Sequence, residues 1–233
     1  MISKKFSSAF ILMGTVLCAG SASANMSPEE AWEHIVSRAQ ASDYVVSAIK
    51  SRDGDQLTVT DIVFRIDDFD AGFSLKFETG DWQFSQQADG SVRMDMAEDA
   101  RWALRFKDMD DERVEIDVAQ FSKDSLMVFK RDGDEISSEY EFGSLRLDFV
   151  RMADEIEVIG KDQLQFSVTL NDISGNSQFR QSDFNVTSGN MDIATAWIDM
   201  NIAPKEEDFR ASWRSNFSDI VFSSTSQIRD GVS

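Results

Sequence analysis

Most of this chain consists of short segments in which apolar and polar residues alternate. In LTVTDIVFRI (residues 57–66), Leu57 and Val59 are apolar, the alternation slips near Asp61, and it resumes with Ile62, Phe64 and Ile66. Successive residues of a strand point to opposite faces of a sheet, so this pattern predicts a half-buried strand with a β-bulge near the slip. Such a chain is expected to form a sheet with one solvent-exposed face and one buried face.

The same alternation recurs between closely spaced turn residues. Alternating segments lie around residues 73–77, 82–84, 92–96, 102–106, 114–118, 145–149, 156–158, 164–170, 194–202 and 209–213. Turn chemistry is found at Asp-Gly (53–54, 89–90, 132–133 and 230–231) and at Ser-Gly-Asn (174–176 and 188–190). Roughly a dozen sequential strands with short connections predict an antiparallel meander.

One short motif returns along the chain. TVTDIVF (58–64) is echoed by TLNDISG (169–175) and NFSDIVF (216–222), and more loosely by RQSDFNV (180–186). The spacing is irregular, so no solenoid is indicated. We interpret the echoes as one kind of strand used repeatedly, with the acid facing water and the next Ile or Phe facing the core. Chance similarity between amphipathic strands is the alternative.

The first two dozen residues have the character of a secretory signal peptide. Lys4 and Lys5 precede an apolar run (10–19), and an Ala-Ser-Ala sequence follows, which predicts removal of residues 1–24 by cleavage between Ala24 and Asn25. A retained N-terminal anchor is the alternative. The protein is therefore expected to be periplasmic or secreted.

The single cysteine, Cys18, lies inside this leader and follows Leu17, whereas a lipoprotein signal has a small residue there. The mature chain would then contain no disulfide, and residues 25–233 are long enough to form one β-rich domain with its own core. No later stretch is apolar for long enough to cross a membrane as a helix.

One amphipathic helix is predicted at the start of the mature chain. Ser27, Pro28 and Glu30 fit the cap, first-turn and capping-box positions. The helix should extend to about Ala41. An apolar stripe is formed by Ala31, Trp32, Ile35, Val36 and Ala39, and His34 beside it is expected at the helix surface.

These elements together predict a mainly β (α+β) fold. Alternating strands in this number cannot stay flat and open, and one helix cannot cover a whole sheet. We expect a curved antiparallel β-meander folded over on itself, with the N-terminal helix closing one end. The dry face would carry many Phe, Met and Trp side chains, which suit a packed core or an apolar groove.

Charge limits the possible partners. The chain contains 23 Lys and Arg against 42 Asp and Glu, a formal net charge of −19. Such a surface repels nucleic acid and anionic headgroups. A lipid or an envelope protein is the expected partner; the oligomeric state stays open.

No catalytic motif is found. His34 is the only histidine and the mature chain has no cysteine, so neither a Ser-His or Cys-His pair nor a zinc set is expected. Phosphate-binding glycine loops are also absent from the sequence. Acidic clusters at 67–70, 108–112 and 132–135 lack EF-hand spacing and are interpreted as solvated turns. We therefore predict no catalytic residue, metal or cofactor.

Tryptophans at strand positions are the candidate ligand-binding residues. Trp82, Trp102, Trp197 and Trp213 would line a groove for a lipid or a sugar if their side chains shared one face. Packing in the core is the alternative.

Three segments carry a family resemblance: SPEEAW (27–32), DGDQLTVTDI (53–62) and VTLNDISGN (168–176). Together with the leader they resemble a family of secreted alphaproteobacterial proteins known by a domain-of-unknown-function label. The resemblance covers most of the mature chain and implies no catalytic residues. Members of that family are usually longer, so the last strand is either a sheet edge or the end of a shortened member. The strand-turn units are also similar in style to AsmA-type and LolA-like envelope proteins, which handle lipids in curved sheets.

Three functions follow as hypotheses. The first is a non-enzymatic periplasmic protein that binds an apolar ligand or an envelope protein. The second is a carboxylate-dependent hydrolase of envelope glycans, which needs two acids in one cleft. The third is a structural envelope module without a ligand, whose interior would be fully packed.

Overall fold

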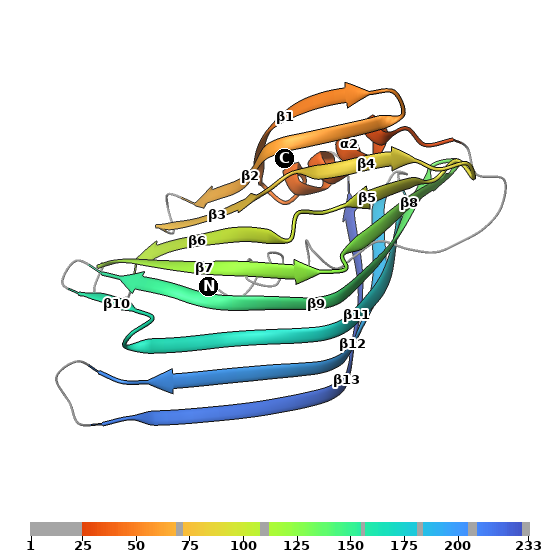
Figure 1. Ribbon diagram of the computed structural model, residues 1–233. Helices are drawn as coiled ribbons and strands as arrows, with labels where there is room; N and C mark the ends of the chain where they lie inside the picture. The colour runs from red at the N-terminus through yellow and green to blue at the C-terminus, as the bar shows by residue number, and fades with distance from the viewer. Residues whose placement is uncertain are drawn as a thin grey trace.

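The computed structural model describes residues 25–68, 72–107, 112–154, 157–180, 184–204 and 209–229. The predicted signal peptide with Ala24, the acidic residues 108–111, Asp183 of the looser echo and the turn at 230–231 lie outside the described residues. The fold class predicted from the sequence is confirmed: a large antiparallel sheet carries one N-terminal helix (Figure 1).

Helix α2 (Pro28–Gln40) begins as the sequence predicts. The Ser27 hydroxyl accepts a hydrogen bond from the Glu30 backbone N–H (3.3 Å), and the Glu30 carboxylate accepts one from the Ser27 N–H (2.8 Å). This capping box satisfies donors that the first helical turn leaves free. In the described part of the chain, no helix has the length and apolar character needed to span a bilayer.

The strands of the described residues form one sheet of 13 strands. They are β1 (Val45–Asp53), β2 (Gln56–Asp68), β3 (Phe73–Thr79), β4 (Trp82–Gln86), β5 (Val92–Asp95), β6 (Asp99–Lys107), β7 (Arg113–Lys123), β8 (Leu126–Asp132), β9 (Glu135–Ala153), β10 (Val158–Gly160), β11 (Leu164–Arg180), β12 (Phe184–Ile202) and β13 (Ala211–Arg229).

Several of these strands are two halves of one longer strand. β3 and β4 are the two halves of one strand, since both pair with β2. β7 and β8 are related in the same way, since both pair with β9. β5 and β6 form a third such strand, in which β6 pairs with β3 and β5 pairs with β4. The result is a simple up-and-down meander of long strands. β1 lies at one edge and β13 at the other.

Every long strand bends where its halves meet, so the sheet has two arms. The β7 arm contains β3, β6, β7 and the adjoining halves of β2, β9 and β11–β13. The β8 arm contains β4, β5, β8 and the remaining halves. The turn between the arms is plain in β9, β11, β12 and β13 (Figure 1). We call the bend line the corner, and the face inside the angle the inner face.

Aspartates in a left-handed backbone conformation make this corner. Asp61, Asp124, Asp172 and Asp219 have φ of 51°, 51°, 50° and 55°. Short polar side chains such as Asp tolerate this region far better than other non-glycine residues. Each residue breaks the two-residue alternation of its strand, so inner-facing residues on either side stand three apart, as Leu170 and Ile173 do.

The repeated Asp-Ile motif is therefore a bend signal. As predicted, Asp61, Asp172 and Asp219 are exposed, and the following Ile62 and Ile173 are buried. The predicted bulge is present where β1 meets β2, since the register shifts between Ser47 and Ile49. The interpretation of the motif as an ordinary alternating strand missed the reason for it, because alternation alone cannot show a positive φ.

Small residues face these aspartates across the corner. Gly143 lies between Asp124 and Asp172 in register, and a Cβ at Gly143 would lie 2.9 Å from Asp124 Oδ2. Ala194 lies between Asp172 and Asp219. A Cβ at Gly143 would also lie 3.2 Å from the Asp124 Cβ, so this close approach favours glycine, and the exposed Ala194 is the small residue at the same place in β12.

The prediction that the two Ser-Gly-Asn sequences form turns is wrong, because both lie inside strands. Gly175 and Gly189 lie inside β11 and β12. A Cβ at Gly175 would lie 2.1 Å from the Tyr140 hydroxyl, and one at Gly189 would lie 2.4 Å from the Ser177 Cβ. These glycines allow a close approach across the inner face, a use of glycine that sequence alone does not separate from turn formation.

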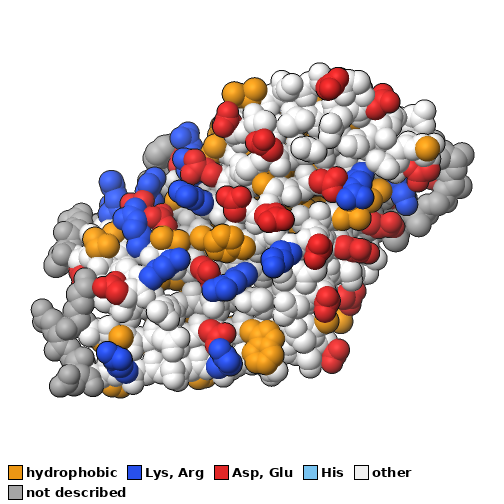
Figure 2. All heavy atoms as spheres, viewed as in Figure 1, with side chains coloured by type: hydrophobic (Ala, Val, Ile, Leu, Met, Phe, Trp, Pro, Cys, Tyr) orange, Lys and Arg blue, Asp and Glu red, His pale blue; other side chains and the backbone are white. Residues whose placement is uncertain are grey.

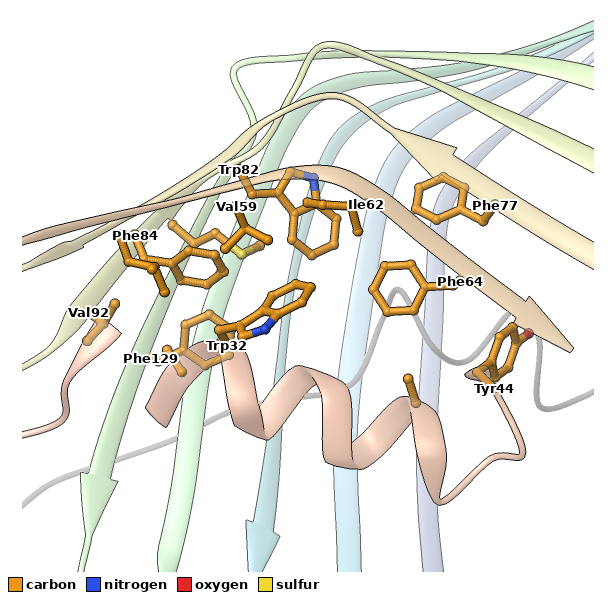
Figure 3. Packing of buried hydrophobic residues seen from close by; sticks show 14 of the residues in the cluster. Trp32, Tyr44, Val59, Ile62, Phe64, Phe77, Trp82, Phe84, Val92 and Phe129 are labelled. Carbon is orange, nitrogen blue, oxygen red and sulfur yellow. The ribbon is translucent and has the colours of Figure 1, made fainter. Parts of the chain in front are cut away.

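The core fills the angle of the sheet beneath α2. Trp32 makes edge contacts with Trp82 and Phe84, with ring centroids 6.2 Å apart in both pairs. Val59, Ile62 and other side chains from β2 and the β8 arm surround them (Figure 3). The predicted helix stripe is confirmed, since Ala31, Trp32 and Ala39 are buried and Ile35 and Val36 pack against the core.

We expect Asp172→Val to lower the free energy of unfolding by about 1–2 kcal/mol, because a β-branched side chain is strained in a left-handed conformation. Asp172→Gly should cost less, since glycine adopts this conformation freely. Chemical denaturation gives the comparison. Asp192→Val is the control, because it removes the same charge from an exposed position outside the positive-φ residues. Equal losses in the two valine variants would contradict this account of the corner.

Candidate functional site

A row of large apolar residues crosses the inner face at right angles to the strands of the β7 arm. In register, Phe64 lies beside Phe77, Phe77 beside Trp102, Trp102 beside Val118, and Val118 beside Phe149. Phe64, Phe77 and Phe149 are only 4%, 5% and 8% exposed. This part of the row belongs to the packed interior.

The row continues beyond the part that is covered. Ser167 pairs with Asp148, which brings Phe166 beside Phe149 at the end of that ladder. Phe166 then pairs with Met200, and Met200 with Trp213. Phe166 is 38% exposed and Trp213 is 50% exposed. The same face therefore changes from core to surface as it approaches β13.

Two more inner-face rows end in the same way. One leads from Leu145 through Leu170 and Ala196 to Phe217, and the other from Tyr140 through Gly175 and Met191 to Phe222. Phe217 and Phe222 are about half exposed. We call Phe166, Trp213, Phe217 and Phe222 the open end of the inner face. It is the candidate binding surface.

The structure separates the four candidate tryptophans. Trp82 is buried under α2 as part of the core. Trp102 lies deeper in the row that ends at Trp213; its Nε1 donates to Gln120 Oε1 (2.9 Å) and its ring centroid is 4.3 Å from that of Phe77. Trp197 lies on the opposite, outer face, because it pairs with Thr169 and Asn216.

Sequence reasoning missed most of the open end. Only Trp213 was among the candidates, whereas Phe166, Phe217 and Phe222 were not singled out. A signal did exist, since Phe166 alternates in phase with Leu164 and Val168. The phase of Phe222 could not be carried across Asp219, because the corner shifts the alternation by one residue.

The outer face of the sheet carries many charged side chains, with a few exposed apolar residues such as Trp197 and Val221 among them. On the β7 arm, Lys and Arg alternate with Asp and Glu (Figure 2). Arg151 joins Asp117 (2.6 Å) and Glu115 (3.2 Å), and Arg105 also joins Glu115 (2.8 Å). The guanidinium of Arg105 lowers the pKa of Glu115, chiefly through this hydrogen bond. Exposed pairs of this kind add little stability but keep the outer face wet.

An open hollow of about 280 Å³ lies on the outer face of the β8 arm. Its lining is made of neutral side chains and glycine: Asn176, Gln178, Ser188, Gly189, Asn190, Ser223, Ser224 and Thr225. A pair of carboxylates, which glycoside hydrolysis requires, is not found in this lining. Across the residues that the structure describes, no group of three or more His, Cys, Asp or Glu side chains is arranged to hold a metal ion.

His34 is buried, and its predicted place at the helix surface is wrong. Its ring lies against Phe179 (centroids 5.3 Å apart) and Phe129 (6.4 Å), because α2 sits inside the angle and both of its sides meet the sheet. The nearby Ser138 and Ser177 face each other across β9 and β11. Within the described residues, His34 Nε2 and both serine Oγ atoms are buried without a hydrogen-bond partner.

Burial controls the protonation of His34. Loss of hydration, with the neighbouring charges of Arg38 and Arg131, lowers the pKa of the imidazole from 6.5 to about 3. Arg38 donates a hydrogen bond to the Thr187 hydroxyl and lies over the Phe179 ring, and Arg131 pairs with Glu30 (2.5 Å). The imidazole is thus a neutral group that fixes α2 to the β8 arm.

No protein-family model, curated protein or solved structure was found to match this chain. The resemblance to a secreted alphaproteobacterial family stays a prediction. The geometry described above therefore carries the functional argument.

We expect acid to destabilise the protein through His34. Below pH 6.5 the unfolded chain takes up a proton on this imidazole, whereas the folded chain does so only near pH 3, so stability falls as the pH falls through this window. Between pH 7 and pH 5, wild type should lose about 2 kcal/mol more than His34→Leu. Denaturation curves at both pH values test this. Equal losses of stability in wild type and His34→Leu would contradict this expectation, because the chain contains 1 histidine and the variant removes it.

Proposed function

We propose that this protein binds an apolar chain, such as the acyl chain of a lipid, on the inner face at the open end. The single observation that carries the proposal is the continuity of the apolar rows. Rows that begin in the packed interior continue onto β11, β12 and β13, where no helix of the described residues lies over them. A ligand laid along these rows would extend the core of the protein.

The chemistry of the open end favours hydrocarbon over a polar ligand. Three phenyl rings and one indole are accompanied by two thioethers: Met200 lies between Phe166 and Trp213 in register, and Met191 lies beside Phe222. Met side chains adapt to irregular apolar shapes, and aromatic rings supply large contact areas. These groups cannot act as an acid, base or nucleophile, which supports a binding role over catalysis.

The location that the sequence predicts is compatible with this role. A leader ahead of residue 25 would deliver the chain to the periplasm or the exterior, where lipids and other amphiphiles must cross water. The net charge of −19 keeps such a carrier soluble. We include a periplasmic or secreted location in the proposal.

A fluorescent fatty acid tests the proposal. We expect saturable binding to the protein expressed with its own N-terminal segment, and a co-purifying amphiphile in native mass spectrometry. Trp213→Ser and Phe217→Ser should each weaken binding about tenfold, since each removes roughly 1–2 kcal/mol of apolar contact.

Trp197→Ser is the matched control, because this indole is also exposed (37%) on β12 but faces outward. It should bind the probe as wild type does, and the far-UV spectra of all variants should agree. The same fluorophore without an alkyl chain should not bind. Loss of binding in Trp197→Ser equal to that in Trp213→Ser, or no binding to wild type, would refute the proposal.

A further inference from the structure

Strand β13 is a long edge with one paired neighbour in the described part of the chain. It contains 19 residues and pairs with β12 alone, from Ala211 opposite Ile202 to Arg229 opposite Phe184. Globular strands are usually about 5–6 residues long, and natural sheets protect their edges. The other edge, β1, contains 9 residues with Lys50, Arg52 and Asp53 near its end.

β13 has few of the features that block strand addition. It contains no proline or lysine, and Arg214 is tied to Asp199 on β12. Near the corner both faces are apolar, since Phe217 and Phe222 face inward while the exposed Val221 faces outward. In a chain with a net charge of −19, this is a segment where another strand meets little repulsion.

The corner restricts the residues that an added strand can place opposite Asp219. Each left-handed aspartate of the corner lies opposite glycine or alanine in register: Asp61 opposite Gly80, Asp124 opposite Gly143, Asp172 opposite Gly143 and Ala194, and Asp219 opposite Ala194. The side chains facing inward across the corner stand three residues apart. The accepting strands therefore read apolar, small, polar, apolar, as in FGSL (142–145) and IATA (193–196).

A second copy does not fit this rule. Two β13 strands paired antiparallel through their free edges would bring the two bends together and set Asp219 against Asp219. That pairing would place like charges opposite one another and put a left-handed residue where every described pair has glycine or alanine. The free edge thus favours a strand of the accepting type.

We propose that the free edge of β13 binds an extended segment of another polypeptide as an additional antiparallel strand. That segment carries glycine or alanine opposite Asp219, followed by a polar and then an apolar residue, with further apolar residues facing inward. Main-chain hydrogen bonds would supply the affinity, and the corner would supply the specificity. This proposal concerns the edge of the sheet and is independent of the apolar ligand on its face.

A peptide with the β12 sequence from Gly189 to Ile202 is the probe, since this sequence already pairs with β13 on its other side. Fluorescence polarisation of the labelled peptide against the full chain should show saturable binding with a Kd in the range of about 1–50 μM. The same peptide with Ala194→Leu should bind at least about tenfold more weakly, because position 194 lies opposite Asp219, where the described corner strands carry glycine or alanine.

Val221→Lys in the protein tests the location, because a charge on an edge strand opposes pairing while the exposed site tolerates it. It should weaken the peptide without changing fatty-acid binding. Three results would overturn the proposal: no saturable binding up to about 200 μM peptide, equal affinity for the original peptide and its Ala194→Leu variant, or a protein dimer that the peptide dissociates. The last result would assign the edge to a second copy.

Discussion

The bend between the two arms is the constraint on which the other features depend. It requires left-handed aspartates and, opposite them, glycine or alanine, and both conditions hold from Asp61 on β2 to Asp219 on β13. A flat sheet of this width would give α2 a single surface to lie on. The curved sheet instead meets more than one side of the helix, since Trp32 packs against β4 and His34 lies against Phe129 and Phe179, all within the β8 arm.

One helix of 13 residues cannot cover the angle from edge to edge. It closes the end formed by β1 to β5, and the inner face emerges from beneath it strand by strand until the aromatic side chains of β13 are half exposed. The open end is therefore a consequence of geometry, because the apolar rows are longer than the element that covers them. The proposed ligand would lie on the part of the inner face that α2 does not reach.

Polar side chains have different surroundings on the outer face and inside the angle of the sheet. The outer face carries ion pairs such as those of Arg151, which cost little because water still reaches them. Inside the angle, His34, Ser138 and Ser177 are buried, and the imidazole stays neutral with a pKa of about 3. Burial of these groups lowers stability and ties helix and sheet to one arrangement at neutral pH.

The sequence by itself determined the elements, since α2 follows from its capping box and apolar stripe and the meander from alternation between turns. It also marked the corner, because the Asp-Ile echoes and the slip at Asp61 are visible in the letters. Only the tertiary structure decided which face each side chain takes beyond a bend. One shifted residue reverses the assignment, so Trp213 and Phe222 share the inner face although strict alternation would place them on opposite faces. Burial of His34 likewise came from tertiary contacts with Phe129 and Phe179, which no local pattern encodes.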